Sequence, residues 1–108
     1  MTTGYVYDEV YLTHNQAGHP ENRTRLEHTI ALLKKSDMLA RLAHIPARPA
    51  TREELTRLHE PAYIDLIKAI SERGGGQLDP DTYVSAGSYQ AALMAAGGLI
   101  KAVGAVMY

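Results

Sequence analysis

The 108-residue sequence contains no cysteine, no tryptophan and no phenylalanine, and its only aromatic residues are seven tyrosines. Without cysteine it can form no disulfide and offers no thiolate for catalysis or metal binding. The 11 Lys and Arg residues are balanced by 12 Asp and Glu residues without a basic run, which argues against a nucleic-acid partner. The tyrosines could stack on a ligand, but as the only large rings they are expected mainly in the core and at interfaces.

The start of the chain lacks the basic residues and the apolar core of a signal peptide. The run 86–107 is rich in Ala and Gly and close to the length of a membrane span. It contains Lys101 and the polar residues Ser88 and Gln90, so we interpret it as a helix of a soluble protein without a membrane partner. Together with the missing cysteines, this favours a cytoplasmic location.

The length of 108 residues predicts a single domain over residues 1–108, and hydrophobic periodicity predicts its elements. Pro20 fits the first turn of a helix, Thr51 and Glu54 form a capping box, and Ser85 is a candidate N-cap. The three glycines 74–76 predict a mobile loop after a helix. The expected elements are a strand at about 4–8 that runs into a loop ending at 20, a helix at about 21–36, a second strand or extended link near 39–47, a short helix from 51 to about 58, a helix from 61 to the glycines, a polar loop over 78–85 and a last helix over 86–107.

The last predicted helix is apolar on nearly every face, which is typical of a helix buried inside a protein. The sequence ends directly after it, at Tyr108, so we expect this helix to be covered by a partner. Its small residues permit close approach of a second helix, and a two-fold homodimer is the expected assembly. The predicted interface residues are Tyr89, Leu93, Ala96, Gly97, Ile100, Val103 and Met107.

Histidines and acids are the candidate chemical groups. His14 and His19 share one loop with Glu21, but no third ligand converges with them in the sequence, so no metal site is predicted. Asp79 and Asp81 could form a pair of carboxylates for acid–base work, or they could serve the turn around Pro80. The five histidines are at positions 14, 19, 28, 44 and 59.

Several separated motifs together resemble the histone deacetylase family, in particular the bacterial histone-deacetylase-like amidohydrolases and acetoin-utilisation proteins. The motifs are His19-Pro20-Glu21-Asn22, Leu55-Thr56-Arg57-Leu58-His59 followed by Pro61-Ala62-Tyr63-Ile64, the segment 79–85 followed by Gly87-Ser88-Tyr89, and Ala95-Ala96-Gly97-Gly98. The resemblance implies an α/β, helix-rich chain: the N-terminal portion of the open, arginase-like deacetylase fold, with one or two short strands and about four helices. It also implies a family of zinc-dependent enzymes that deacetylate acetyl-lysine, acetylpolyamines or similar amides.

The resemblance places only the mouth of the substrate pocket in this chain. Asp81 matches a rim carboxylate that binds the substrate backbone, and the loop 14–21, with His19 and Pro20, matches one wall of the entrance. The paired histidines and the Asp-x-His zinc motif of the family are absent from the sequence. We therefore expect no catalytic residue and no zinc in this chain.

Two functions remain open from the sequence. The first is a non-catalytic module whose last helix binds another copy of the chain, a full-length deacetylase or a C-terminal polypeptide. The alternative is the N-terminal piece of a complete or split zinc-dependent deacetylase.

Overall fold

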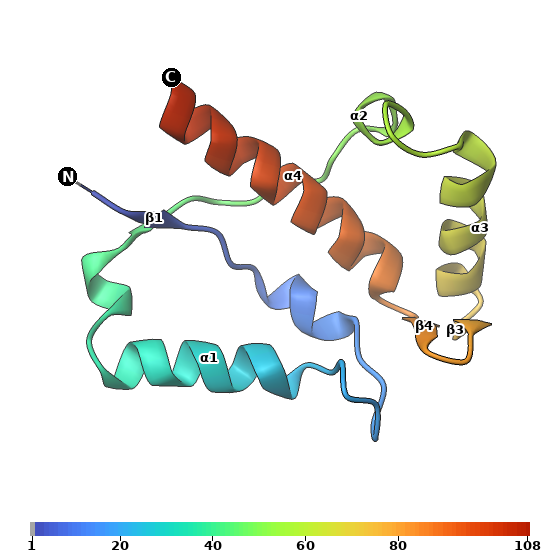
Figure 1. The fold of residues 1–108 in the computed structure, drawn as a ribbon, viewed down its shortest axis with the longest axis horizontal. Coiled ribbons are helices and arrows are strands. Elements are labelled where there is room, and N and C mark those ends of the chain that lie inside the picture. Colours follow the sequence, from blue (N-terminus) through green and yellow to red (C-terminus); the bar gives the residue numbers. More distant parts are fainter. Residues whose placement is uncertain (1) are drawn as a thin grey trace.

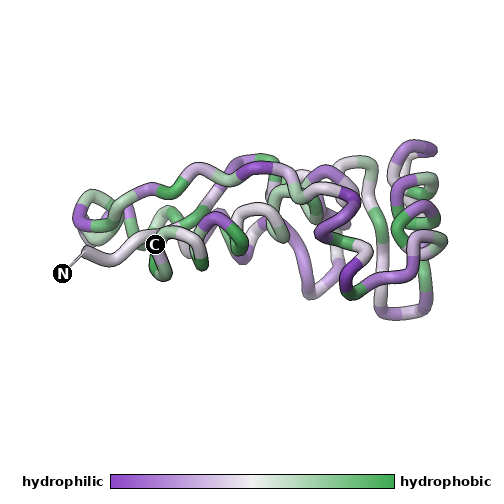
Figure 2. Tube along the Cα trace, turned by 90° about the horizontal axis from the view of Figure 1, so that it is seen from above, coloured by the Kyte–Doolittle hydropathy of each residue, from purple (hydrophilic) through white to green (hydrophobic). Residues whose placement is uncertain are grey.

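The structure is organised along one long helix, α4 (Ser88–Met107), which crosses the molecule diagonally (Figure 1). The computed structural model describes residues 2–108. Its extents of 42 × 35 × 18 Å show a flat molecule, and Figure 2 shows the thin side. The elements in chain order are β1 (Gly4–Tyr5), η1 (Glu9–Thr13), α1 (Thr24–Lys35), η2 (Leu39–Arg41), β2 (Ala43–His44), α2 (Arg52–Thr56), α3 (Pro61–Glu72), β3 (Gly75–Asp79), β4 (Thr82–Ser85) and α4.

The strands form two separate pairs. β1 and β2 are parallel, with Tyr5 opposite His44, and β3 and β4 form an antiparallel hairpin. The hairpin register is irregular between Gln77 and Asp79, just before its turn. The predicted α/β, helix-rich class is confirmed, with four short strands among the described residues where one or two were expected.

The first strand is shorter than predicted. It ends at Tyr5, and the apolar residues that follow form the 3-10 helix η1. Asp8 begins this turn, because its side chain accepts a hydrogen bond from the backbone N–H of Val10 at 2.9 Å. The hydroxyl of Tyr11 then donates to the carbonyl of Met94 at 3.1 Å and ties η1 to α4.

Helix α1 begins three residues later than predicted, at Thr24, so Pro20 does not lie in its first turn. Asn22 explains the delay. Its Oδ1 accepts from the N–H of Thr24 at 2.9 Å and its Nδ2 donates to the carbonyl of His19, which closes a turn ahead of the helix.

The glycines 74–76 form no mobile loop, which corrects the sequence prediction. Gly74 and Gly75 have φ values of +104° and +114°, and the chain turns directly from α3 into β3. A Cβ on Gly75 would lie 2.6 Å from the carbonyl oxygen of Val84 on the paired strand. Glycine is therefore needed both for the backbone angle and for the approach of β4.

The start of α4 also differs from the prediction. Ser85 belongs to β4, and the N-cap position is taken by Gly87. The hydroxyl of Ser88 accepts from the backbone N–H of Ser85 at 2.7 Å, so the strand and the helix are joined by a tight corner.

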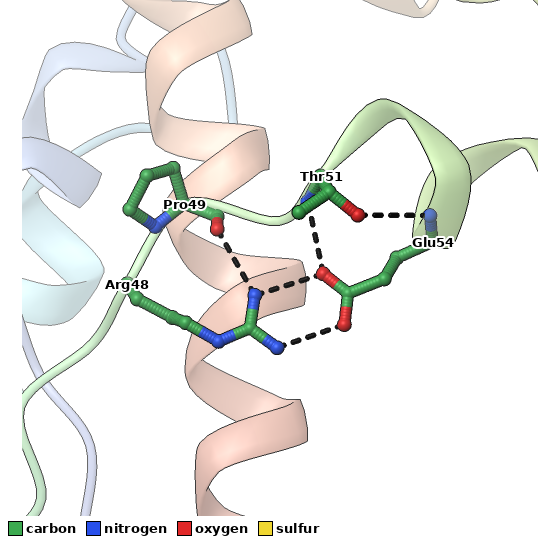
Figure 3. Close-up of polar contacts among 4 residues, drawn as sticks. All are labelled: Arg48, Pro49, Thr51 and Glu54. Carbon is green, nitrogen blue, oxygen red and sulfur yellow. Dashed lines mark hydrogen bonds and ion pairs between the residues drawn. The ribbon is translucent and has the colours of Figure 1, made fainter.

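An extended segment, residues 45–50, crosses α4 and is called the strap below. The backbone N–H of Ala50 donates to the carbonyl of Leu93 at 2.9 Å. Arg48 anchors the strap through two hydrogen bonds of 2.8 Å to Glu54, which also completes the predicted capping box with Thr51 (Figure 3). The strap is thus held to α4 by the Ala50–Leu93 hydrogen bond and to α2 by the Arg48–Glu54 pair.

The Arg48–Glu54 pair makes stability depend on pH. The hydrogen bonds from Arg48, followed by that from the backbone of Thr51, lower the pKa of Glu54 from 4.5 to about 2. A lowered pKa means that the stabilisation is complete above pH 4.5 and is lost as the pH falls from about 4.5 to about 2. We expect Glu54→Gln to be less stable than wild type at pH 7 and to lose less stability in that window, as measured by urea midpoints.

The control for this experiment is Glu53→Gln. It removes a carboxylate from the same turn, and Glu53 forms no ion pair within residues 2–108. It should show the wild-type decline, and an equally steep decline in Glu54→Gln would contradict the assignment.

Candidate functional site

The loop 14–21, called the entrance loop, packs on the hairpin β3–β4, called the rim hairpin. Tyr83 of β4 is buried at the contact. His14 stacks on the Tyr83 ring with centroids 4.6 Å apart and planes 7° apart, and His19 meets it edge-on at 4.8 Å. The Tyr83 hydroxyl donates to the carbonyl of Glu21 at 2.6 Å. Burial first, and then the negative charge of Glu21, raise the pKa of Tyr83, so it remains a neutral donor.

His19 joins the loop to the tip of the hairpin. Its Nε2 lies 3.0 Å from the carbonyl oxygen of Asp81, and its Nδ1 accepts from the backbone N–H of Glu21 at 3.0 Å. The structure therefore brings together His19 and Asp81, two of the residues predicted at the pocket rim. Pro20 lies exposed between His19 and Glu21.

The two hairpin acids have different roles. The carboxylate of Asp79 accepts from the backbone N–H of Asp81 at 2.9 Å, which is the turn role expected beside proline. Asp81 is exposed, and within residues 2–108 its own carboxylate takes part in no hydrogen bond or ion pair. The pair therefore presents one carboxylate to solvent and uses the other to shape the turn.

A group of serines at the start of α4 was missed by the sequence reasoning. His14 Nδ1 lies 2.5 Å from the hydroxyl of Ser88, and the hydroxyl of Ser85 donates to the carbonyl of Thr13 at 2.7 Å. The hydroxyl of Ser71 donates to the carbonyls of Ser85 and Ala86. These contacts hold the entrance loop, α3 and the corner before α4 together. No spacing in the sequence relates positions 14, 71 and 88, so no local signal could have predicted them.

The histidines and acids do not assemble into a metal site in the described part of the chain. Within residues 2–108 no group of three or more His, Cys, Asp or Glu side chains could hold a metal ion. His14 and His19 lie against Tyr83, and His14 Nδ1 and both ring nitrogens of His19 are bonded to neighbours. The zinc implied by the resemblance therefore does not fit a site built from these residues alone.

A groove of about 510 Å³ opens beside the entrance loop, and its floor is the first half of α4. The lining is mainly apolar and includes small alanines that leave space above the helix. The lining residues are Tyr11, His14, Leu26, Tyr63, Ile67, Leu78, Tyr83, Val84, Ser88, Ala91, Ala92 and Ala95.

The groove continues along α4 as an exposed apolar stripe. With 3.6 residues per turn, five residues share this side of the helix. They are Ala92, Ala95, Leu99, Val103 and Val106, called the α4 stripe below. Leu99, Val103 and Val106 are 66%, 53% and 84% exposed. By length and composition alone α4 could cross a membrane, and only 17% of its apolar stretch is buried within the described residues.

The predicted interface residues lie on two sides of α4. Val103 is in the stripe, and Ile100 and Met107 are exposed beside it. Gly97 instead is buried against the chain's own strap, and the backbone carbonyl of Leu93 accepts a hydrogen bond from it. Tyr89 and Ala96 are half-buried. The strap therefore occupies the Gly97 side of α4, whereas Ile100, Val103 and Met107 remain exposed, and the interface itself stays a prediction.

Comparison with known proteins decides the family. A model of the histone deacetylase domain matches residues 19–108, from His19 of the entrance loop to Tyr108 after α4. The chain belongs to the histone deacetylase family. This agrees with the resemblance of the motifs, the first of which starts at the same histidine.

The relatives of this histone deacetylase family member are much longer than the chain. It is 36% identical over 110 residues to a probable deacetylase of Archaeoglobus fulgidus, covering 99% of the chain and 30% of that protein. It is 42% identical over 94 residues to a histone deacetylase-like amidohydrolase of Pseudomonas aeruginosa, covering 84% of the chain and 24% of that protein. The crystal structure of the HDA15 HD domain matches 90% of this chain and 29% of its own, with a TM-score of 0.84 and 30% identity.

Proposed function

We propose that this chain forms the N-terminal, entrance-building part of a deacetylase-type amidohydrolase and that it does not hydrolyse amides by itself. The observation that carries this proposal is the open groove and the α4 stripe, an apolar surface that runs from the entrance loop along the whole helix. Apolar patches of this extent on soluble proteins mark surfaces that other protein segments cover. Relatives named deacetylase or amidohydrolase, of which the chain spans less than a third, support the same conclusion.

The proposed contribution to substrate binding is the rim. Asp81 presents a carboxylate without a partner in the described residues, beside an apolar groove. A carboxylate accepts hydrogen bonds from amide N–H groups and attracts the positive charge found on polyamines and basic peptides. The substrate class that fits is an acetyl-lysine peptide or an acetylpolyamine, with His19 and Pro20 shaping the wall next to the rim.

The proposed contribution to folding is the α4 stripe. Elements that complete the α/β fold would cover it, and the metal ligands and proton-transfer groups would come from those elements. They belong either to a longer form of the chain or to a separate C-terminal polypeptide. In both cases we place the chain in the cytoplasm, a location with which a sequence without cysteine is compatible.

A second candidate function is self-association, favoured by the exposed large side chains of α4. Without the completing elements, the stripe would bury itself against a second copy in a two-fold dimer or against a full-length deacetylase. In this state the chain would be a non-catalytic interaction module.

The experiment that tests the main proposal is a graft. The chain replaces the corresponding part of the Pseudomonas aeruginosa amidohydrolase, to which it is 42% identical. We expect the graft to fold and to deacetylate an acetyl-lysine peptide, and the chain alone to show no activity. A graft that folds and binds zinc but remains inactive would contradict the proposal.

A further inference from the structure

The hydrogen bonds of His19 determine which of its nitrogens carries the proton. Nδ1 accepts from the backbone N–H of Glu21, so in the neutral ring Nδ1 has no hydrogen. The proton is therefore on Nε2, which donates to the carbonyl of Asp81 at 3.0 Å. Each ring nitrogen thus bonds one backbone group, and together they join two segments that lie 62 residues apart in sequence.

The tip of the rim hairpin needs such a support. Its strand pairing is irregular between Gln77 and Asp79, so the ladder does not continue regularly into the turn. Asp79 fixes the N–H of Asp81 and His19 fixes its carbonyl, so both backbone polar groups of residue 81 are held. The carboxylate of Asp81 is left for another partner.

We propose that His19 is a positioning residue that latches the entrance loop to the rim hairpin and thereby places the carboxylate of Asp81 for substrate. The functional half of this inference rests on the proposed role of Asp81 as the rim carboxylate, whereas the latch itself rests on geometry alone. The edge of the His19 ring against buried Tyr83 fixes the direction in which Nε2 points. The hydroxyl of Tyr83, bonded to Glu21, provides a second connection between the same two segments.

Two amide replacements of His19 separate its contact with Asp81 from its contact with Glu21. In His19→Gln the side-chain NH2 group can reach the place of Nε2 and donate to Asp81. In His19→Asn the side-chain oxygen takes the place of Nδ1 and can accept from Glu21, but nothing reaches Asp81. If the contact to Asp81 matters, glutamine restores the wild-type behaviour and asparagine does not. His28→Asn is the control, because His28 is an exposed histidine of α1 outside the latch.

The first readout uses the 108-residue chain and needs no activity. We expect nitrogen NMR to show His19 as the Nε2–H tautomer. We also expect amide exchange at Asp81 and Thr82 to rise at least fivefold in His19→Asn, and to stay within twofold of wild type in His19→Gln and His28→Asn. An Nδ1–H tautomer, or equal exchange in the Gln and Asn variants, would overturn the latch.

The second readout uses the graft. We expect His19→Asn and Asp81→Asn each to raise KM about tenfold with little change in kcat, and His19→Gln to recover most of the loss. A fall in kcat at unchanged KM would overturn the positioning role. An inactive wild-type graft would count against the proposed function, and the exchange data would still decide the latch.

Discussion

Replacing Gly97 by alanine is expected to separate the strap from α4 and to destabilise the chain strongly. A Cβ at position 97 would overlap the carbonyl oxygen of Arg48 and would lie 2.8 Å from the backbone nitrogen of Ala50. Both neighbours are backbone atoms, so no side-chain rotation relieves the clash. The strap must move away, and the hydrogen bond from Ala50 to Leu93 is lost with it.

The expected loss in the free energy of unfolding is about 3 kcal/mol, the upper range for overpacking in a closely packed contact. The matched control is Gly104→Ala, in the same helix, where a Cβ would meet nothing within 4 Å. That change should stabilise the helix by about 0.5–1 kcal/mol, because alanine loses less backbone entropy than glycine. Urea unfolding of both variants measures the difference. Equal stability of the two would show that the strap does not pack on α4 as described.

The second large effect is expected from a charge in the α4 stripe. Val103→Asp places a carboxylate within the surface that we propose is covered by another protein segment. Burying an unpaired carboxylate there costs several kcal/mol, which corresponds to association at least 100-fold weaker. Light scattering coupled to gel filtration should show a self-associated wild-type chain and a monomeric Val103→Asp variant.

Lys101→Asp is the control for this change. Lys101 is exposed and lies two residues before Val103, so it is on the other side of a helix with 3.6 residues per turn. The Lys101→Asp variant introduces the same carboxylate outside the stripe, so its assembly should retain the wild-type mass in solution. A monomeric wild-type chain, or equal masses for both variants, would contradict an interface on this side of α4.

The sequence predicted the elements whose signals are local. The capping box of Thr51 and Glu54 satisfies backbone N–H groups within one turn, and it is confirmed. The helix predicted from residue 61 also begins there, because Pro61 has no N–H that the first turn would leave unbonded. The last helix was predicted from its composition and begins only two residues later than expected.

Elements that depend on distant partners were not predicted. The glycines 74–76 indicate a loop in any local reading, and Gly75 and Gly76 become part of a strand only because β4 pairs closely against them. The side of α4 that faces the strap could not be predicted either. Small residues mark a close contact, but the sequence does not say that the contact is with Arg48 and Ala50 of the same chain rather than with a second molecule.

The candidate site shows the same division. The family motifs placed His19 and Asp81 at one rim, and the structure brings them into contact. The burial of Tyr83 between two histidines and the serine contacts of His14 arise from the packing of loop, hairpin and helix. Neutral hydroxyls leave no periodic pattern in a sequence, so these contacts require the structure.

If this chain builds the entrance of a deacetylase, it needs further elements for catalysis. The rate of acetyl-lysine hydrolysis, measured for the chain alone and for the graft, with and without a zinc chelator, tests this dependence. We predict no hydrolysis by the chain and chelator-sensitive hydrolysis by the graft. Hydrolysis by the chain alone, or a folded, zinc-loaded graft without activity, would show that the proposed division of labour is wrong.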